Sequence, residues 1–408
     1  MFAIRLTLLI ALSISLLLGC AKPETSEGER AQVQTSEAPS FWDEPQAGAN
    51  SFNAAPPDQA YFEALAATGA SWVRLTFSKW DGEGRDFLIG NADEFTSIPP
   101  ADMANLIRVL DNAHAANMKV VIAPLTLPGA RFSQHNDDQY DDRLWSDKTY
   151  WAQTAEFWAE LSMALKDHPA VIGYNMLNEP APEKMVGGVE NGTVAQSRKF
   201  AADTVGTARD LFQFYETIIT AIRAADPDTP IMVDAGYYAN PISLAGWASA
   251  LSDDNILYSI HMYEPYNATS APNRTREVPL RYPGVTSSYQ GAETSWSKDT
   301  IKTHIGTAFD WARSVGVPAN RMVIGEFGCV RDWVDCEAYL TDVLDVATEH
   351  QTHWAFYAFR PDEWDAMDYE LPIDYPAGQF YWLREDGRVD ELPRNGALMR
   401  IIQSYMPE

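Results

Sequence analysis

Several features that mark other classes of protein are scarce or missing in this sequence. It holds three cysteines and seven histidines in 408 residues, and no pair of nearby histidines accompanies the cysteines, so a metal site is not expected. A nucleotide fingerprint and a P-loop are also missing, and we therefore expect catalysis without a cofactor. With 46% hydrophobic and 21% charged residues, the composition excludes a disordered chain and a polytopic membrane protein.

Basic residues are in short supply. Lys and Arg total 30 against 57 Asp and Glu, which gives a formal net charge of −27. Such a field repels nucleic acid and anionic polymers, so neither is an expected partner. A neutral substrate fits this charge, whereas a polyanionic one such as a uronan does not, although an acidic surface also serves solubility alone.

Long hydrophobic runs are lacking except near the amino terminus. A mostly apolar stretch from Leu6 to Leu18 is too short to span a membrane as a mature helix, and it closes with Leu17-Leu18-Gly19-Cys20. That ending resembles a bacterial lipobox, which predicts a lipoprotein signal peptide over residues 1–19 and a diacylated Cys20. By resemblance to the usual sorting rule, Ala21 suggests the outer membrane of a bacterial cell envelope. A cleaved signal peptide of a soluble exported protein is the alternative.

The chain after the signal divides into two parts. Residues 20–40 are rich in Ser, Glu, Pro and Ala and predict a flexible, lipid-anchored linker. Aromatic residues begin abruptly at Phe41-Trp42, so we place one large domain over residues 41–408. Cys329 and Cys336 are expected to form a disulfide, since they lie seven apart in an exported protein. We expect a monomer whose only membrane contact is the lipid anchor.

Short apolar runs alternate with amphipathic helical stretches along this domain. Continuous apolar runs are typical of strands covered on both faces, as in parallel sheets. The predicted strands are 48–53, 71–77, 119–125, 171–177, 230–236, 256–263, 321–328 and 353–359. The predicted helices are 58–69, 101–117, 150–168, 208–226, 299–316 and 336–350, with a weak one at 241–251 in the fifth unit. About eight such units favour an α/β fold, the (β/α)8 TIM barrel.

The predicted loops are long on one side of this barrel only. The long ones follow the carboxyl ends of the second, fourth, sixth and eighth strands, whereas the helix-to-strand turns are tight. Barrel active sites lie on the face formed by the carboxyl ends of the strands. The asymmetry therefore predicts a functional site on the C-terminal face.

Two glutamates stand at strand ends on that face. Glu179 follows the fourth strand in Asn178-Glu179-Pro180, and Glu326 ends the seventh in Gly325-Glu326-Phe327-Gly328. A glutamate there costs desolvation energy unless it is paired, hydrogen-bonded or protonated. Because strand ends converge on the barrel axis, the two carboxyl groups can face each other, as glycosidic cleavage by an acid and a carboxylate requires. A structural role in capping a loop is the alternative for either glutamate alone.

These motifs resemble those of glycoside hydrolase family 5, the cellulase-type branch with catalytic glutamates on strands four and seven. The likeness extends to Val73-Arg74-Leu75, to His261-Met262-Tyr263 and to Trp354, and it covers about residues 45–405. The resemblance implies retaining hydrolysis of β-glycosidic bonds, with Glu179 as the acid/base and Glu326 as the nucleophile.

The resemblance also implies roles for other residues. Arg74 and the Tyr263 hydroxyl would stabilise the nucleophile, and Asn178 would bond the 2-hydroxyl of the sugar. His261 would orient the acid/base or a sugar hydroxyl, and Trp354 would form the stacking floor under the sugar that is attacked. Ordinary core packing or pairing is the alternative for Arg74, His261 and Trp354 taken singly.

One departure from the family bears on substrate binding. Many members carry a histidine at the end of the third strand, where this chain reads Ala123-Pro124-Leu125-Thr126, and only His135 lies a little further on. A conventional cellulase subsite is therefore not assured. The polar stretch 360–365 could bind the hydroxyls of a terminal sugar. Tryptophans on or near the long loops are candidates for stacking on sugar rings: Trp80, Trp145, Trp247, Trp296 and Trp364.

The expected substrate is a β-glucan, a mannan or another neutral β-linked carbohydrate at the cell envelope. No appended carbohydrate-binding module is found, which argues against attack on crystalline polymer. An exo-β-glycosidase or transglycosylase is the alternative among enzymes, and a non-catalytic glycan-binding envelope lipoprotein is the alternative outside them. The joint presence of both glutamates with Arg74, Asn178 and Tyr263 favours an enzyme. A structural calcium near Asp137-Asp138 and Asp141-Asp142 stays open.

Overall fold

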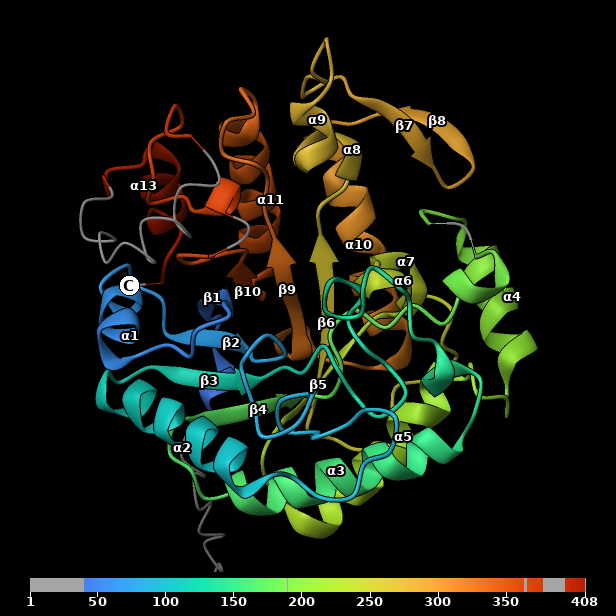
Figure 1. Ribbon diagram of the computed structural model, residues 1–408. Coiled ribbons are helices and arrows are strands. Elements are labelled where there is room, and N and C mark those ends of the chain that lie inside the picture. The colour runs from blue at the N-terminus through green and yellow to red at the C-terminus, as the bar shows by residue number, and fades with distance from the viewer. Residues whose placement is uncertain (1–39, 189, 363–364, 377–392, 408) are drawn as a thin grey trace, which may run out of the picture. The chain divides into compact units, whose positions relative to one another are not determined.

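A closed barrel of eight parallel strands forms the centre of the protein (Figure 1). The computed structural model describes residues 40–188, 190–362, 365–376 and 393–407. Around the barrel the strand order is β1-β10-β9-β6-β5-β4-β3-β2. The strands are β1 (Ala47–Phe52), β2 (Trp72–Thr76), β3 (Lys119–Ile122), β4 (Val171–Asn175), β5 (Ile231–Asp234), β6 (Ile256–Met262), β9 (Met322–Phe327) and β10 (His353–Phe356). All eight coincide with predicted strands, and the (β/α)8 fold is confirmed.

Helices surround the barrel in the order the sequence predicted. The long ones are α1 (Gln59–Ala66), α2 (Pro100–Ala115), α3 (Thr149–Leu165), α5 (Leu211–Ala225), α10 (Lys298–Val315) and α11 (Cys336–His350), followed by α13 (Ala397–Gln403). Two of them begin at aspartates whose side chains accept backbone N–H groups of the first turn, Asp58 from Tyr61 and Asp210 from Gln213. The fifth unit has only α6 (Gly236–Ala239) and α7 (Pro241–Leu244), in line with its weak pattern.

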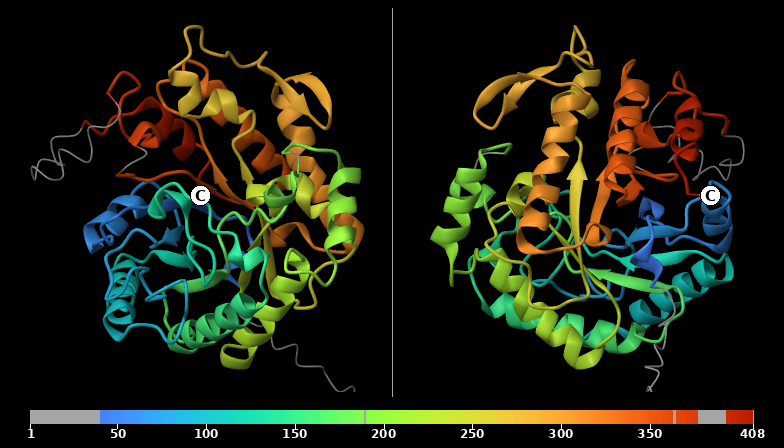
Figure 2. Two further views of the ribbon diagram at one scale, coloured as in Figure 1. Left: turned by 45° about the vertical axis from the view of Figure 1, so that its right-hand side comes forward. Right: turned by 180° about the vertical axis from the view of Figure 1, so that it is seen from behind.

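The loops on the C-terminal face carry structure that the sequence did not predict. Helix α4 (Val194–Thr204) lies between β4 and α5, while α8 (Tyr266–Thr269), α9 (Ala271–Arg274) and the antiparallel hairpin β7 (Thr286–Tyr289) and β8 (Ala292–Ser295) follow β6. The hairpin and the two short helices project beyond the end of β6 in the views of Figure 1 and Figure 2. These insertions extend beyond the strand ends on the face where the predicted site lies.

The barrel interior changes character along its axis. Its lower part is an apolar cluster that includes Trp42, which comes from the turn before β1 and closes the barrel from below: Trp42, Trp72, Val121, Met232, Leu257, Val323 and Ala355. Above this cluster the inward-facing side chains are polar, with Asn50, Arg74, Asn175, Asp234 and His261 all buried. Arg74 and Asp234 lie two residues after cluster members on their strands, so they stand one layer above the cluster, and His261, four residues after Leu257, stands higher still. The packed floor thus supports a polar site.

Some predictions lie outside the described residues. These are the signal peptide over residues 1–19, the anchor at Cys20, the linker up to residue 39, and Trp364. Within the described ranges, no helix has the length and apolarity needed to cross a membrane.

Candidate active site

The two predicted catalytic glutamates meet above the barrel floor. One carboxylate oxygen of Glu179 and one of Glu326 lie within 4.8 Å of each other. Enzymes that retain configuration hold their carboxyl groups about 5–5.5 Å apart, whereas inverting enzymes leave about 6.5–9.5 Å for a water molecule. The separation is therefore that of a retaining pair.

A bulge in β9 turns Glu326 toward the barrel axis. Val323 faces inward, so strict alternation would point Gly325 inward and Glu326 outward. Instead the pairing of β6 with β9 shifts by one residue, and His261 lies opposite Glu326. Gly325 is the extra residue, and a Cβ there would meet Ser259 Oγ at 2.3 Å. The glycine before the glutamate thus allows the bulge that re-aims the side chain.

The Glu326 carboxylate is held by two donors. Arg74 Nη1 donates to Oε1 at 2.6 Å, and the Tyr263 hydroxyl donates to Oε2 at 2.7 Å. The Arg74 side chain is fully buried, and although burial lowers its pKa, the carboxylates of Asp234 and Glu326 raise it overall. Burial, with the charge of Glu326 next, holds the pKa of Tyr263 well above its usual value. Both neighbours therefore act as donors to the two oxygens of Glu326.

Glu179 lies in a different environment. Its side chain is 29% exposed, and its Oε1 lies 2.8 Å from His261 Nδ1. Burial raises the pKa of Glu179, the hydrogen bond from His261 opposes that rise, and the charge of Glu326 adds to it. The backbone of Glu179 has a φ of 50°, a left-handed conformation that non-glycine residues seldom adopt, and its N–H donates to Asp234. Burial and the charge of Glu326 thus favour the protonated form of Glu179, and the bond from His261 favours the ionised form.

The pKa of His261 is also displaced. Burial lowers it, but the nearby carboxylates of Glu326, Asp234 and Glu179 raise it overall. Nδ1 lies 3.8 Å from Glu326 Oε2, and Nε2 lies 3.5 Å from Asp234 Oδ2. His261 therefore supplies positive charge to the site between the two glutamates.

Three buried residues of the site were missed at the sequence level. Asp234 on β5 accepts hydrogen bonds from Arg74 and from the side chain of Asn175, and Asn50 on β1 contacts Arg74 Nη1 at 3.3 Å. The only sequence signal was a polar residue inside an apolar strand run, as in the predicted strand 230–236. Together they fix the guanidinium that holds the nucleophile.

Asn178 lies between Arg74 and Glu179. Its Oδ1 accepts a hydrogen bond from Arg74 Nη2 at 2.6 Å, and the side chain is half-buried beside Glu179. Because the carbonyl oxygen is engaged by Arg74, the amide nitrogen is the group left to donate to a sugar hydroxyl.

The predicted role of Trp354 as the stacking floor is wrong. Its neighbour Ala355 belongs to the barrel interior, so Trp354 points outward; it is 4% exposed and packs edge-on against Phe327 at 5.8 Å between ring centroids. Trp354 therefore cannot form the floor of the cleft. Tyr357, two residues after Ala355, faces the axis instead, is half-buried and contacts the Tyr263 ring at 6.4 Å. Tyr357, beside Tyr263, is therefore the aromatic ring that this strand end turns toward the axis.

The tryptophans suggested for sugar stacking are packing residues in the described part of the chain. Trp80, Trp145, Trp247 and Trp296 are all buried. His135 is exposed and stacks on Phe132 at 6.1 Å, away from the contacts made by either glutamate. Exposed aromatic surface near Glu179 comes from tyrosines instead, with Tyr140 39% and Tyr266 47% exposed.

Two cavities flank Glu179. One of about 370 Å³ is lined by residues of the loops after β4, β5 and β6, among them Lys184, Glu190, Tyr238 and Tyr266. A second of about 130 Å³ lies toward the loop after β3 and includes Phe132 and Asn178. The larger groove of about 940 Å³ under α4 is mostly apolar and contains neither glutamate. The cavities that adjoin the chemistry are therefore the two beside the acid.

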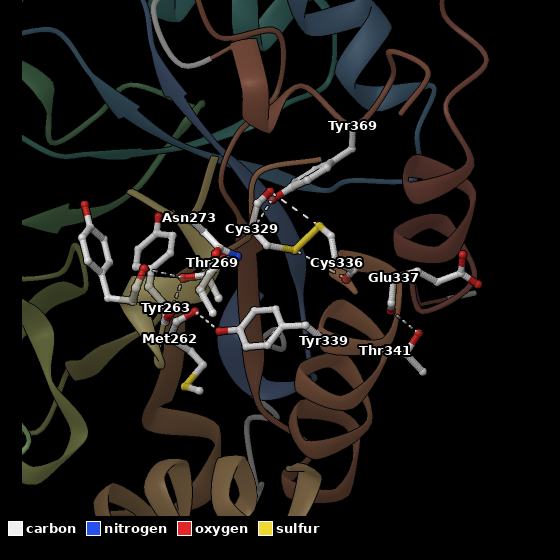
Figure 3. Close-up of a disulfide and its surroundings, with 12 residues drawn as sticks. Met262, Tyr263, Thr269, Asn273, Cys329, Cys336, Glu337, Tyr339, Thr341 and Tyr369 are labelled. Atoms are coloured by element: carbon white, nitrogen blue, oxygen red, sulfur yellow. Dashed lines mark hydrogen bonds between the residues drawn. A yellow bond between two sulfur atoms is a disulfide. The ribbon is translucent and has the colours of Figure 1, made fainter. Parts of the chain in front are cut away.

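The predicted disulfide between Cys329 and Cys336 is present, just beyond the strand that carries Glu326 (Figure 3). Cys329, just beyond β9, is bonded to Cys336 at the start of α11. The Tyr369 hydroxyl accepts the Cys329 N–H at 2.9 Å and donates to its carbonyl oxygen at 3.1 Å. Tyr339 of α11 donates to the Met262 carbonyl oxygen at 3.1 Å. The segment after the nucleophile is thus tied to α11 and to the end of β6.

Glu179, His261 and Glu326 also form the one group among the described residues that gathers three metal-type donors. The guanidinium of Arg74 already compensates Glu326 at 2.6 Å, and a divalent cation placed there would be repelled by it. In the acidic loop considered above as a calcium site, the Asp141 carboxylate already pairs with Arg143 at 2.7 Å. The arrangement fits acid/base and nucleophilic chemistry better than metal binding.

Replacing Arg74 with lysine is expected to lower kcat/KM about 100-fold. One ammonium cannot reproduce the separate bonds that Arg74 makes to Asn175, Asn178 and Glu326, and each abandoned buried acceptor costs about 1–3 kcal/mol. Steady-state kinetics with a thermal melt would measure both losses. Unchanged kinetics would contradict the role of Arg74 in holding the nucleophile.

Comparison with known proteins agrees with this geometry. A protein-family model described as Cellulase (glycosyl hydrolase family 5) matches residues 27–363. A beta-xylosidase of Phanerodontia chrysosporium is 25% identical over 219 residues, 53% of this chain and 38% of that protein. Endoglucanase 3 of Fibrobacter succinogenes is 26% identical over 253 residues, 54% of this chain and 35% of that protein. The chain therefore spans little more than a third of these curated relatives.

A solved structure shares the fold. An endoglucanase of Pseudomonas stutzeri in complex with cellobiose superposes with a TM-score of 0.59 at 15% identity, over 89% of this chain and 92% of that one. At this identity the likeness supports the barrel alone.

Proposed function

The chain belongs to the cellulase family, glycosyl hydrolase family 5, and from that premise we propose that it hydrolyses β-glycosidic bonds of neutral glucan- or mannan-type carbohydrate with retention of configuration. The observation that carries this proposal is the separation of at most 4.8 Å between oxygens of Glu179 and Glu326.

In the first step Glu326 attacks the anomeric carbon. A bond forms between that carbon and a Glu326 oxygen while the bond to the leaving oxygen breaks, and the proton of Glu179 passes to the leaving oxygen. Arg74 and Tyr263 hold the attacking carboxylate in place. Asn178 donates to the 2-hydroxyl, a contact that strengthens as positive charge develops on the sugar.

In the second step water displaces Glu326 from the anomeric carbon. Burial still raises the pKa of Glu179, but the Glu326 ester is neutral, so the part of the rise that came from the charge of Glu326 is lost. Having given up its proton, Glu179 can now act as a base. It takes a proton from water while the water oxygen attacks the anomeric carbon and the Glu326 carboxylate leaves. Two inversions at one carbon give net retention.

This assignment predicts the alkaline limb of the pH profile. The first step needs protonated Glu179, whose pKa lies above that of an ordinary glutamate because of burial, so kcat/KM falls as pH rises through that raised pKa. In His261→Gln the charge-assisted bond that opposes the rise is lost. The limb is expected to move to higher pH, with about tenfold lower activity at the optimum. A limb that stays in place or moves to lower pH would contradict the pairing of His261 with Glu179.

We also propose that the protein is a monomer held by a lipid on Cys20 at the outer membrane of a bacterial envelope. The support is the sequence Leu17-Leu18-Gly19-Cys20-Ala21. Incorporation of labelled palmitate into the full chain, lost in Cys20→Ser, with recovery in the outer-membrane fraction, is the expected result. A labelled Cys20→Ser protein would overturn the anchor, and light scattering of the domain tests the monomer.

The proposed reaction is tested by release of reducing sugar from neutral β-glucans, mannans and xylans. Turnover of at least one glucan or mannan is expected. Binding of such oligosaccharides without any turnover would favour the non-catalytic glycan-binding alternative.

A further inference from the structure

The two sides of the catalytic pair differ in structure. This inference rests on the proposed glycosidase function: the difference determines where a sugar chain is cleaved. In the barrel order, β10, β1 and β2 are adjacent and lie across the axis from β6, β5 and β4. Glu179 protonates the leaving oxygen, so the cavity of about 370 Å³ that it shares with the loops after β4, β5 and β6 receives the leaving group. The glycone side lies over β10, β1 and β2.

Residues 359–362, here called the closing segment, follow β10 and are bonded to the loops after β1 and β2 on the glycone side. Its Asp362 carboxylate pairs with Lys79 Nζ at 2.9 Å and accepts the Ala54 N–H at 2.5 Å. The Lys79 and Asp362 side chains are only 1% and 2% exposed. The segment is thus joined to the loops after β1 and β2, which follow the neighbouring strands.

Backbone groups complete this closure. Asn53 donates to the Arg360 carbonyl oxygen and accepts the Asp362 N–H, both at 3.1 Å, and Phe359 N–H donates to the Asn50 carbonyl oxygen. The Lys79 ammonium lies 4.2 Å above the Phe52 ring. These polar groups satisfy one another, so the segment has the character of a wall and not of a further sugar subsite.

The leaving-group cavity differs from this wall, because polar groups in it are available to a ligand. Neither ring nitrogen of the fully buried His304, in its wall, has a partner among the described residues, and burial lowers its pKa to about 3, so the ring is neutral. The carboxyl groups of Glu190 and Glu264 also line the cavity. Burial and the neighbouring charge of Glu264 raise the pKa of Glu190 to about 7, and Glu264 accepts the Tyr266 N–H at 3.0 Å. Tyr266 adds a ring that is 47% exposed. Hydrogen-bonding capacity is concentrated on this side.

We propose that the cleft accepts only the terminal, non-reducing sugar on the glycone side, so that the enzyme removes single sugars from chain ends while the remaining oligosaccharide occupies the leaving-group cavity. The closing segment determines this specificity. The ion pair between its Asp362 and Lys79 holds the segment in place.

Reducing-end-labelled pentasaccharides of β-1,3-glucan, β-1,4-glucan and β-1,4-mannan test the proposal at low conversion. The expected first products are a free monosaccharide and the labelled tetrasaccharide. Labelled di- or trisaccharides among the first products would overturn chain-end action while leaving the hydrolase function intact. Failure to hydrolyse any of the three, together with inactivity on the polysaccharides, would instead count against the hydrolase function.

A double variant tests the wall itself. Lys79→Met with Asp362→Asn removes both charges together, because removal of one alone would leave an unpaired buried charge. Opening of the glycone side is expected to add labelled di- and trisaccharide to the first products. The control is Arg223→Met with Asp253→Asn, which removes a partly buried ion pair joined at 2.6 Å outside both cavities that adjoin Glu179.

The control is expected to keep the product pattern of the parent, and thermal melts report whether either double variant is folded. If the Lys79/Asp362 variant is folded but keeps the parental pattern, the closing segment does not determine specificity. If that variant does not fold, the parental product pattern decides the proposal alone.

Discussion

Glu326→Gln is expected to lower kcat by roughly 10⁵-fold, the scale seen when a catalytic nucleophile is removed. The amide is nearly isosteric but cannot form the covalent bond to the anomeric carbon. It also turns an N–H group toward Arg74 or Tyr263, both of which are donors to the native carboxylate. Initial rates with an activated aryl β-glycoside, whose leaving group needs little protonation, measure this loss directly.

Glu63→Gln serves as the matched control for this loss. Glu63 is exposed on the outer helix α1, where it accepts a bond from Gln59, and it lines neither cavity beside Glu179. The control is expected to retain parental kcat and melting temperature. Substantial activity in a folded Glu326→Gln protein would remove Glu326 from the chemistry.

Glu179→Ala is expected to lower kcat on unactivated oligosaccharides by about 10²–10⁴-fold, the usual contribution of general acid–base catalysis. Loss should be much smaller on an aryl glycoside with a good leaving group, because only the second step then needs Glu179. Alanine also opens space beside the anomeric carbon, next to the cavities that Glu179 lines. Azide, which needs no base, should enter there and restore turnover.

The product of that rescue identifies the mechanism. Attack of azide on the Glu326 ester gives a β-glycosyl azide, which NMR distinguishes from the α-anomer. The parent enzyme with azide is the control and should form only free sugar. If azide leaves Glu179→Ala inactive on the aryl glycoside, or yields the α-azide, the assignment of Glu179 as acid/base fails.

The strands and the two glutamates could be predicted because their signals are local. Continuous apolar runs mark buried parallel strands, and Glu179 and Glu326 stand at the ends of two of them. The direction of a side chain is not local in the same way. Residues 353–359 are apolar on both faces, so sequence did not reveal that Ala355 and Tyr357 point inward and Trp354 outward.

Other parts of the site depend on contacts between distant residues. Arg74 and Asp234 are 160 residues apart, and Lys79 and Asp362 are 283 apart. A buried pair of this kind leaves no periodic pattern in either segment. The bulge at Gly325 is similar, since only its pairing with β6 shows that alternation is interrupted before Glu326. The same limit explains why α4 and the hairpin β7–β8 were missed.

Tryptophan content was a poor guide to sugar binding. Large aromatic rings contribute most when buried, and Trp80, Trp145 and Trp296 pack inside the fold. Tyrosine combines a ring with a hydroxyl that can remain hydrated, which suits a cleft for hydroxyl-rich ligands. Four tyrosines line the leaving-group cavity: Tyr237, Tyr238, Tyr263 and Tyr266.

The anomeric configuration of the first-formed sugar tests the central claim most directly. Proton NMR during the first minutes of hydrolysis of a β-glycoside, before mutarotation equilibrates the product, resolves the two anomers. Double displacement at Glu326 with Glu179 as acid/base predicts that the β-anomer appears first and the α-anomer only later. Initial appearance of the α-anomer would show single displacement and contradict the retaining mechanism.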